Sequence, residues 1–347
     1  MYTKNFKQLS KNDVGIAGGK GASLGEMTKA KILVPPGFVI LVEAFDRFMA
    51  ETDLSAEIIG IIKNINYKDL NSVDAASNKI RDLIYDVPMP KDLENNFLAE
   101  FKKLKTPLVA VRSSATAEDS SVASWAGELE TYLNTTEKNL IDNIKKCWSS
   151  LFTPRALFYA FEKKVFTKKH QEKIRALTSK NLKDAYPVSV AVVVQKMVQS
   201  EIAGITFTAH PVTRDRNQMV IEAAYGLGEL IVSGQVTPDT YIVGKSQYPN
   251  NKLQIKSKIQ NPKSDFSIVD INTSEQKEML VRGGAGIKRV SVPKNKQERQ
   301  KLTGAQIIKL AELCQKIEEH YKFPQDIEWA LEKGKFYITQ SRPITTL

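Results

Sequence analysis

The two halves of the chain carry different hydrophobic periodicities, and this difference limits the possible folds more than any other sequence feature. Between residues 43 and 161, apolar side chains recur mainly at helical spacing, as in the face formed by Leu140, Ile144 and Trp148. From residue 186 onward, short apolar segments typical of strands prevail. Helices that are separated along the chain from strands are typical of an α+β fold. We therefore predict the α+β class.

A change of lobe is expected at Ala185-Tyr186-Pro187, which gives an N-terminal lobe over residues 1–185 and a C-terminal lobe over 186–347. The first lobe also contains two short apolar segments that we predict to be strands, at 38–42 and 108–111. In the second lobe we expect strands at 189–198, 205–208, 219–223, 240–243 and 253–258, a helix at 303–321, and a hairpin of 326–331 with 335–342.

The charge of the chain raises the question of nucleic-acid binding. Its 347 residues carry a formal net charge of +11 at pH 7. The lysines are dispersed, however, and no aromatic residues alternate with them to form a stacking platform. We therefore attribute most of the charge to solvated faces, with a small contribution from a cleft that attracts a polyanion, and we expect no nucleic-acid partner.

The chain shows no membrane or secretion signal. Its first residues are polar, and its most apolar stretch, 188–194, is too short to span a bilayer. Cys147 and Cys314 are far apart in sequence and lie on apolar helical faces, which favours buried free thiols over a disulfide. We expect a cytoplasmic protein without a membrane partner.

A glycine-rich segment, GGKGASLGEM at 18–27, predicts a loop that leads into a helix. Backbone N–H groups of such a loop approach phosphate oxygens closely, and Lys20 adds a mobile cation. The P-loop pattern fails because Val14 occupies its first glycine position and Gly21 follows the lysine. The G-x-G-x-x-G pattern fails at Leu24. A tight structural turn with a solvated lysine remains the alternative.

A second motif follows the strand expected at 108–111. Arg112 ends this strand, where a buried guanidinium needs a partner or a ligand. Its parallel donors suit a phosphate, and the small-residue run after it suits a lid that closes over phosphates. The alternative is an arginine that pairs with Glu118 or Asp119 in an ordinary loop.

The last motif is DIEWALEKGKFYITQSRP, which predicts a hairpin. Glu328 meets Gln340 only across a loop with an odd number of residues, which 333–335 supplies. A carboxylate beside an amide oxygen suits Mg²⁺, whose other ligands are water and phosphate oxygens. Arg342 then faces the same phosphates. The alternative is an ion pair between Glu328 and Arg342 on an exposed sheet.

Two middle segments complete the pattern. The strand at 192–198 is suited to run along a nucleotide base, with backbone hydrogen bonds to its edge and apolar contact with its face. The segment 222–229 reads as a strand and a glycine turn, for which a structural role is favoured. The three histidines show no repeated spacing, and we expect them to be solvated or structural.

These motifs, in this order, resemble the ATP-grasp nucleotide-binding domain of the family that contains phosphoenolpyruvate synthase (pyruvate, water dikinase), pyruvate phosphate dikinase and rifampicin phosphotransferase. The resemblance runs nearly end to end and is closest to phosphoenolpyruvate synthase in VRSSATAED and GLGE…VSG…VTPD. The segments that carry it are GGKGASLGEM, VRSSATAEDSSVASWAGELETYL, GITFTAHPVTRDRNQ, GLGELIVSGQVTPDTY and DIEWALEKGKFYITQSRP.

The resemblance implies ATP and Mg²⁺ as cofactors and two α+β lobes that clasp the nucleotide. It implies that Arg342, Arg112 and Lys20 are catalytic, with Arg342 acting on the transferred group, and that these and the other residues bind ATP. The implied contacts are Lys20 and Arg112 with phosphates, Gly127 and Thr131 from the lid, Gln195 with Met197 and Val198 at the base, Glu201 at the ribose, and Glu328 with Gln340 at the metal.

The chain departs from the family pattern in two respects. Its lid reads SSVASWAGEL at 120–129, without the Pro-Asp and paired glutamines common in the family, which puts the lid contacts in doubt. The sequence also stops soon after Arg342. We therefore expect the two partners implied by the family, a swivelling phosphohistidine domain and a pyruvate- or phosphoenolpyruvate-binding domain, to lie outside this chain.

Three functions are compatible with these residues. The first is the ATP half of a dikinase reaction, in which the β-phosphate passes to a histidine on another domain and AMP and phosphate remain. The second keeps the same ATP site but passes phosphate to an antibiotic such as rifampicin. The third is a nucleotide-binding module without catalysis.

Overall fold

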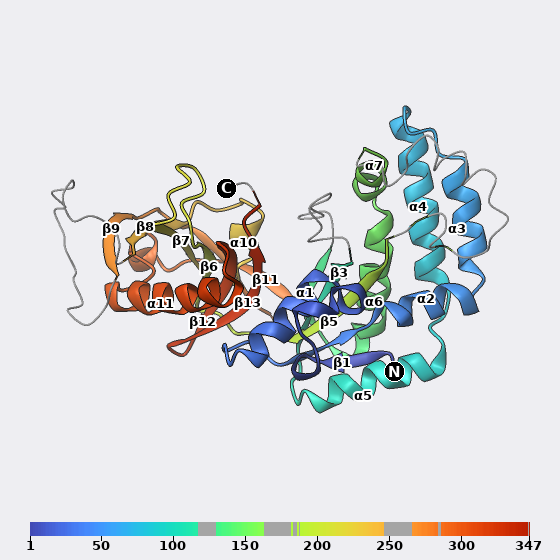
Figure 1. Cartoon of the computed structure of the whole chain (residues 1–347), viewed down its shortest axis with the longest axis horizontal. Helices are drawn as coiled ribbons and strands as arrows, with labels where there is room; N and C mark the ends of the chain where they lie inside the picture. The colour runs from blue at the N-terminus through green and yellow to red at the C-terminus, as the bar shows by residue number, and fades with distance from the viewer. Residues whose placement is uncertain are drawn as a thin grey trace. The chain divides into compact units, whose positions relative to one another are not determined.

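The computed structural model describes residues 1–116, 130–162, 182, 186, 188–245, 266–283, 286–345 and 347. The chain forms two units, each built on an antiparallel sheet (Figure 1). Unit 1 consists of Met1–Glu26 and Pro36–Met197, and unit 2 of Met27–Pro35 and Val198–Leu347.

The sheet of unit 1 has five strands in the order β1-β2-β5-β3-β4, and all neighbours are antiparallel. Its central strand, β5, is rich in valine, and its residues from Val190 to Val194 are buried on both faces. β-Branched side chains suit such a strand. The bounds are β1 (Thr3–Asn5), β2 (Gly37–Ile40), β3 (Val109–Ala115), β4 (Thr131–Thr135) and β5 (Val190–Lys196).

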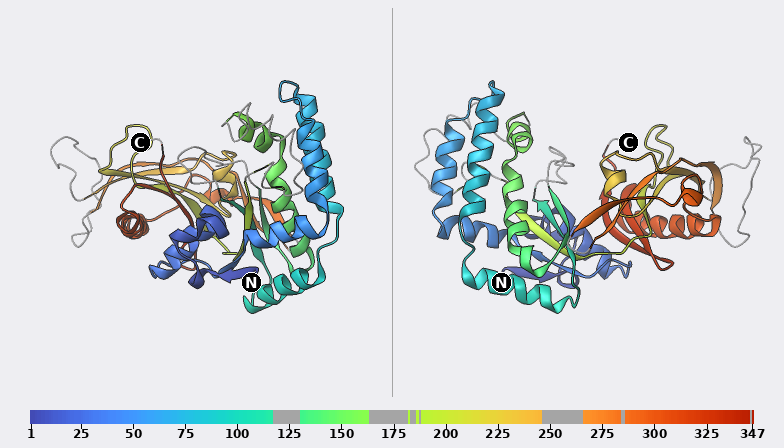
Figure 2. Two further views of the ribbon diagram at one scale, coloured as in Figure 1. Left: turned by 45° about the vertical axis from the view of Figure 1, so that its right-hand side comes forward. Right: turned by 180° about the vertical axis from the view of Figure 1, so that it is seen from behind.

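Helices cover both faces of this sheet. Helices α2 to α7 share a hydrophobic core with one face, and α1 packs on the other, where Gly21 lies against Val39. Helices α3, α4 and α7 stand side by side (Figures 1 and 2). The bounds are α1 (Val14–Lys29), α2 (Val42–Glu51), α3 (Leu54–Lys63), α4 (Leu70–Asp86), α5 (Lys91–Lys103), α6 (Leu140–Ser149) and α7 (Pro154–Glu162). Short 3₁₀ turns span Phe6–Gln8, Lys11–Asp13, Glu137–Asn139 and Ser150–Phe152.

Trp148 anchors the core of unit 1. Its ring is fully buried and packs against Phe45, Phe48 and Phe97, with ring centroids 5.8, 5.1 and 6.4 Å away. The apolar stripe of α6 places Trp148 one turn after Ile144, so that both side chains face the sheet. Aromatic contacts of this kind contribute beyond the area that they bury.

The sheet of unit 2 has six strands in the order β13-β12-β6-β7-β8-β9. One face packs on α11, whose N-terminus is fixed by a capping box between Thr303 and Gln306. The bounds are β6 (Ile202–Phe207), β7 (Gln218–Tyr225), β8 (Asp239–Gly244), β9 (Ser267–Asn272), β12 (Gln325–Glu332), β13 (Lys335–Pro343) and α11 (Gly304–Tyr321). The short helix α10 (Glu229–Val232), the two-stranded ribbon β10 (Glu278–Arg282) with β11 (Ile287–Ser291), and a 3₁₀ turn at Lys294–Lys296 complete it.

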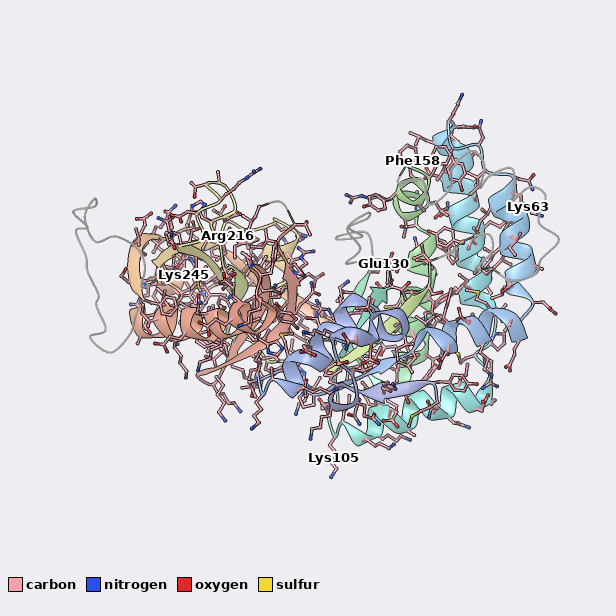
Figure 3. All side chains as sticks on the ribbon, in the orientation of Figure 1. Lys63, Lys105, Glu130, Phe158, Arg216 and Lys245 are labelled. Atoms are coloured by element: carbon pink, nitrogen blue, oxygen red, sulfur yellow. The ribbon has the colours of Figure 1, made fainter. Side chains whose placement is uncertain are left out.

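A buried ion pair joins α11 to the sheet of unit 2. Lys301, just before α11, lies 2.7 Å from Asp239 at the start of β8, and both side chains are 0% exposed. The same carboxylate accepts hydrogen bonds from the Tyr241 hydroxyl at 2.7 Å and from the Ser274 amide at 2.9 Å. Removing one partner of such a pair leaves an uncompensated charge in the interior. Lys245, which directly follows β8 and is labelled in Figure 3, pairs with Glu318 of α11 at 2.6 Å.

The α+β class predicted from the sequence is confirmed. The change of unit comes later than the predicted boundary between 185 and 186, because β5 pairs with β2 and β3 in the first sheet. Strands β1, β4, β9, β10 and β11 were not predicted from the sequence, and the strand expected at 253–258 lies outside the described residues. Cys147 and Cys314 are buried free cysteines, as expected. Within the described segments, no helix combines the length and the apolar character needed to cross a membrane.

Candidate functional site

Three of the predicted site residues share one face of the sheet in unit 1. Arg112 on β3 is paired with Thr131 on β4 and with Val193 on β5. Gln195, two residues beyond Val193, therefore points to the same side. We call this surface the Arg112 face. The opposite face contributes Val109 and Val111 to the hydrophobic core.

The strands of the Arg112 face hold its polar side chains in different environments. Arg112 is 8% exposed and Gln195 is 3% exposed, whereas Thr131 is exposed. Beyond Gln195, the backbone of β5 is tied to both neighbours: the amides of Lys196 and Met197 donate to the carbonyls of Pro36 and Leu108, at 2.8 and 3.2 Å. The sheet thus places a guanidinium and a carboxamide on adjacent strands of one surface.

The glycine-rich segment packs against β3 through a break in α1. The loop expected at the start of 18–27 is reduced to a single break at Gly18, with φ of 67°, because the rest of this segment is helical within α1. Ser114, two residues beyond Arg112, contacts both sides of this break. Its hydroxyl donates to the Ala17 carbonyl at 2.9 Å and accepts from the Gly21 amide at 3.2 Å. Lys20, half-buried, follows the break directly.

Glu130, labelled in Figure 3, directly precedes β4 and anchors the start of this strand to β3 and α4. Its carbonyl accepts from the amide and the hydroxyl of Ser113, at 3.2 and 2.9 Å. Its carboxylate lies 2.9 Å from Arg81 of α4 and accepts a hydrogen bond from the Tyr132 hydroxyl. Burial and the neighbouring Glu130 raise the pKa of Tyr132, which keeps this phenol protonated. These contacts hold Thr131 opposite Arg112.

Three other predicted site residues follow β5 in the chain and differ in their exposure. Met197 is half-buried, Val198 is buried and Glu201 is exposed. The Glu201 carboxylate accepts from the Lys333 amide at 3.0 Å, and its own amide donates to the Leu331 carbonyl at 2.9 Å. Glu201 therefore stabilises the turn between β12 and β13, a role that the sequence did not indicate. Gly127, expected in the lid, lies outside the described residues, as do the alternative partners of Arg112, Glu118 and Asp119.

The remaining predicted residues share one face of the sheet in unit 2. Glu328 on β12 is paired with Gln340 on β13, as the hairpin pattern predicts. On its other side Glu328 is paired with Ile205 of β6, which is paired with Glu222 of β7. All four side chains therefore project from the same surface, away from α11. We call it the Glu328 face.

The turn that produces this pairing differs from the expected one. Glu332 pairs with Lys335, so the loop has two residues, Lys333 and Gly334, both with positive φ. This combination is typical of a type I′ hairpin turn. Thr339 is an extra residue on β13, and this bulge brings Gln340 opposite Glu328. The expected three-residue loop is wrong, but the bulge has the same effect on the register.

Arg342 is held by Asp326, its direct partner across β12 and β13. Its Nε and one Nη lie 2.8 and 2.7 Å from the same Asp326 oxygen. Burial raises the pKa of Asp326, Arg342 opposes this increase, and Glu328 adds to it. Burial also raises the pKa of Glu222, together with the charge of Asp326. The Glu328 face is therefore an acidic surface with one arginine at its edge.

The donor set of Glu328 and Gln340 fits magnesium. Both offer hard oxygen ligands, and Gln340 is only 6% exposed, so its amide belongs to a preformed surface. Among the described residues, no three or more His, Cys, Asp or Glu side chains are grouped so as to hold a metal ion. Two protein ligands are nevertheless sufficient for a magnesium ion that is bound mainly by nucleotide phosphates and water.

No role was predicted from the sequence for Ser114, Asp326 or Glu222. Strand alternation does place Ser114 beside Arg112 and Asp326 beside Glu328, and this signal was available. The partners of Ser114 are 97 and 93 residues away, beyond any local pattern. A cavity of about 600 Å³, lined by Tyr67 and Phe161 among others, contains none of the predicted residues.

Comparison with known proteins adds an independent observation. The family described as pyruvate phosphate dikinase, AMP/ATP-binding domain, matches residues 14–347. A probable phosphoenolpyruvate synthase of Methanocaldococcus jannaschii is 43% identical over 348 residues, which cover 98% of this chain and 26% of that protein. The phosphoenolpyruvate synthase of Pyrococcus furiosus is 39% identical over 391 residues, covering 100% of this chain and 44% of the relative.

A protein with a different acceptor is also similar. The rifampicin phosphotransferase of Bacillus cereus is 34% identical over 351 residues, covering 100% of this chain and 36% of that protein. The chain spans less than half the length of each of these relatives. The family model covers nearly all of the chain and confirms the resemblance carried by its motifs. The chain therefore belongs to the pyruvate phosphate dikinase AMP/ATP-binding domain family.

Proposed function

We propose that the chain binds ATP and acts as the phosphoryl donor of a phosphoenolpyruvate synthase-like dikinase. The observation that carries the proposal is the Arg112 face, where Arg112 and Gln195 project from adjacent strands beside the segment that contains Lys20. A guanidinium and an ammonium suit the polyphosphate, and the carboxamide suits the base edge. The match to an AMP/ATP-binding family supports the same ligand.

In this proposal the two units clasp one nucleotide, as in an ATP-grasp fold. Unit 1 binds the phosphates through Lys20 and Arg112 and the base through Gln195. The remaining nucleotide contacts are Gly127 and Thr131 at the phosphates, Met197 and Val198 at the base, and Glu201 at the ribose. One oxygen of the Glu201 carboxylate accepts from the Lys333 amide, so the contact with the ribose requires the other oxygen.

Unit 2 supplies the groups that act during transfer. Glu328 and Gln340 would hold the Mg²⁺ that accompanies ATP, and the ion would neutralise charge on the phosphate oxygens. Arg342 stabilises the charge that spreads over the transferring phosphoryl group. Asp326 holds the guanidinium in place before transfer, so that it need not reorganise when the charge develops.

The acceptor belongs to another part of the protein. By analogy with the family, a histidine on a swivelling domain takes the β-phosphate, water takes the γ-phosphoryl group, and AMP and inorganic phosphate remain. A further domain would bind pyruvate or phosphoenolpyruvate. The identity of 39% to a phosphoenolpyruvate synthase over the whole chain supports this choice of acceptor.

The test combines the chain with MgATP and a phosphohistidine domain from a phosphoenolpyruvate synthase. We expect AMP and phosphate in equal amounts with the phosphorylated domain, and no AMP without that domain. Binding of ATP without AMP formation would favour a nucleotide-binding module that lacks catalysis. A chain that does not bind MgATP at all would contradict the proposal.

An antibiotic phosphotransferase is the second candidate, and the 34% identity to the rifampicin phosphotransferase over the whole chain supports it. The two candidates share the ATP site and differ in the acceptor. Pairing the chain with the phosphohistidine and acceptor domains of each enzyme separates them. Faster turnover with pyruvate than with rifampicin is the result expected for the first candidate.

A further inference from the structure

Ser114 occupies an unusual position between the strand of Arg112 and the helix of Lys20. Its side chain is fully buried on the Arg112 face. One hydroxyl group makes two hydrogen bonds there, to the Ala17 carbonyl before the break in α1 and from the Gly21 amide after it. These bonds connect β3 to both sides of the break.

A break in a helix leaves carbonyl groups of the first segment and amide groups of the second without helical partners. A side chain at the N-cap position usually accepts from such an amide. Here that position is Gly18, which has no side chain, and the hydroxyl comes instead from a strand 93 residues away. Ser114 therefore caps the second helical segment from outside the helix.

Gly18 and Ser114 are fitted to each other. A Cβ atom on Gly18 would lie 2.2 Å from both the carbonyl oxygen and the hydroxyl of Ser114. The φ of 67° at Gly18 also disfavours any other residue. The backbone of the break can thus approach β3 only because position 18 is glycine, and the approach is what allows the hydroxyl to reach both partners.

We propose that Ser114 is a positioning residue of the phosphate site, which fixes the backbone that carries Lys20 relative to Arg112. The inference rests on the proposed function, because it assumes that both cations bind one polyphosphate. Arg112 is fixed by its own strand, whereas the segment of Lys20 is fixed to that strand by the Ser114 hydroxyl. Loss of the hydroxyl frees the helical segment that carries Lys20 and weakens binding of the phosphates. Binding of the base, which occurs through β5, is unaffected.

The test uses Ser114→Ala in the 347-residue chain, titrated calorimetrically with MgATP and separately with adenosine. We expect the Kd for MgATP to rise about tenfold and that for adenosine to change by less than about twofold. A general loss of structure would weaken both ligands together. Ser114→Cys, which keeps a weak donor and acceptor, should give an intermediate Kd for MgATP and provides the comparison if the alanine variant does not fold.

Ser150→Ala is the matched control. Ser150 is a fully buried serine of the same unit, and its hydroxyl donates to the Cys147 carbonyl at 2.7 Å. This variant should lose stability but bind both ligands as the original chain does. An unchanged MgATP affinity in Ser114→Ala, or a parallel loss of adenosine affinity, would overturn the positioning role alone. Failure of the unaltered chain to bind MgATP would instead overturn the proposed function together with it.

Discussion

The Arg112 face and the Glu328 face are both surfaces of antiparallel sheets, but they are assembled differently. The Arg112 face depends on a contact between Ser114 of β3 and Gly21 of α1, which are 93 residues apart in sequence. The Glu328 face depends on the register of neighbouring strands, with Glu328, Gln340 and Arg342 all in one hairpin. The first face carries Arg112 and Gln195 beside the helical segment of Lys20, and the second carries carboxylates with Arg342 paired to Asp326.

We infer from this difference that the two faces have different functions. A polyanion is recognised best by the cationic face, whereas the acidic face is suited to hold a metal ion and to act on charge that develops during transfer. Substitutions in unit 1 should therefore affect mainly the binding of the nucleotide. Substitutions in unit 2 should affect mainly transfer and the magnesium dependence of binding.

Arg342→Ala should have the largest effect. We expect phosphoryl transfer to fall by about a thousandfold, because in the proposed function this arginine stabilises the transition state, while most of the ATP affinity remains. Single-turnover assays of AMP formation, combined with MgATP titrations, measure both quantities. Arg289→Ala, which removes an exposed arginine paired with Glu278, is the control and should change neither. Near-normal transfer in Arg342→Ala would contradict the proposal that the Glu328 face acts in transfer.

Lys301→Met should be the most harmful to stability. It leaves the Asp239 carboxylate buried without its cation, which costs about 3 kcal/mol or more. Urea denaturation measures the change. Lys277→Met removes a partner from an exposed pair with Glu275 at 3.3 Å and should cost about 0.5 kcal/mol or less. Equal losses of unfolding free energy in the two variants would show that the buried pair stabilises unit 2 no more than the exposed pair does.

Glu328→Ala should weaken MgATP binding about tenfold and leave the binding of ATP without magnesium unchanged. The reason is that only the metal-dependent part of the affinity passes through this carboxylate. Parallel titrations with Mg²⁺ and with a chelator separate the two. Glu332→Ala, at the far end of the same strand, serves as the control. The same magnesium dependence in Glu328→Ala and the unaltered chain would rule out the ligand role.

Glu222→Gln should have the smallest effect, a gain of about 1 kcal/mol or less in stability at neutral pH. Because burial raises the pKa of Glu222, the folded chain holds this proton at pH values where the unfolded chain has lost it. The stability that this proton contributes is complete below the unfolded pKa and is lost as the pH rises through the folded pKa. A glutamine at this position does not ionise, so the stability is not lost as the pH rises.

Melting curves from acidic to neutral pH measure this gain for Glu222→Gln. Its advantage over the original chain should grow with pH. A gain for Glu222→Gln that is independent of pH would mean that the carboxylate is not desolvated on the Glu328 face.

The sequence was most informative where structure is local. The Glu328–Gln340 pair and the class of the fold follow from alternation and spacing within short segments. The bulge at Thr339 was missed because a turn of two residues with a bulge and a turn of three residues produce the same register. The order of the strands was beyond such reasoning, since β5 lies between β2 and β3 only through contacts distant in sequence.

The candidate site shows the same limit. Arg112 was identified because a buried arginine at the end of a strand needs a partner. The Ser114 bonds depend on which elements pack together, and one sequence does not specify this. The Asp326 partner of Arg342 follows from the same hairpin register as the Glu328–Gln340 pair, so it was within reach of the strand pattern. The roles assigned through the family resemblance, from Lys20 to Arg342, remain predictions that the experiments above address.

The buried tryptophans provide a built-in optical readout for each unit. Trp148 lies in the aromatic core of unit 1, and Trp329 lies on β12, with its ring 5.5 Å from that of Phe336. In a chain whose remaining tryptophan, Trp125, is replaced by phenylalanine, either Trp148→Phe or Trp329→Phe leaves a single emitter in a known unit. Intrinsic fluorescence of such variants would therefore show which half of the molecule responds when a nucleotide is added.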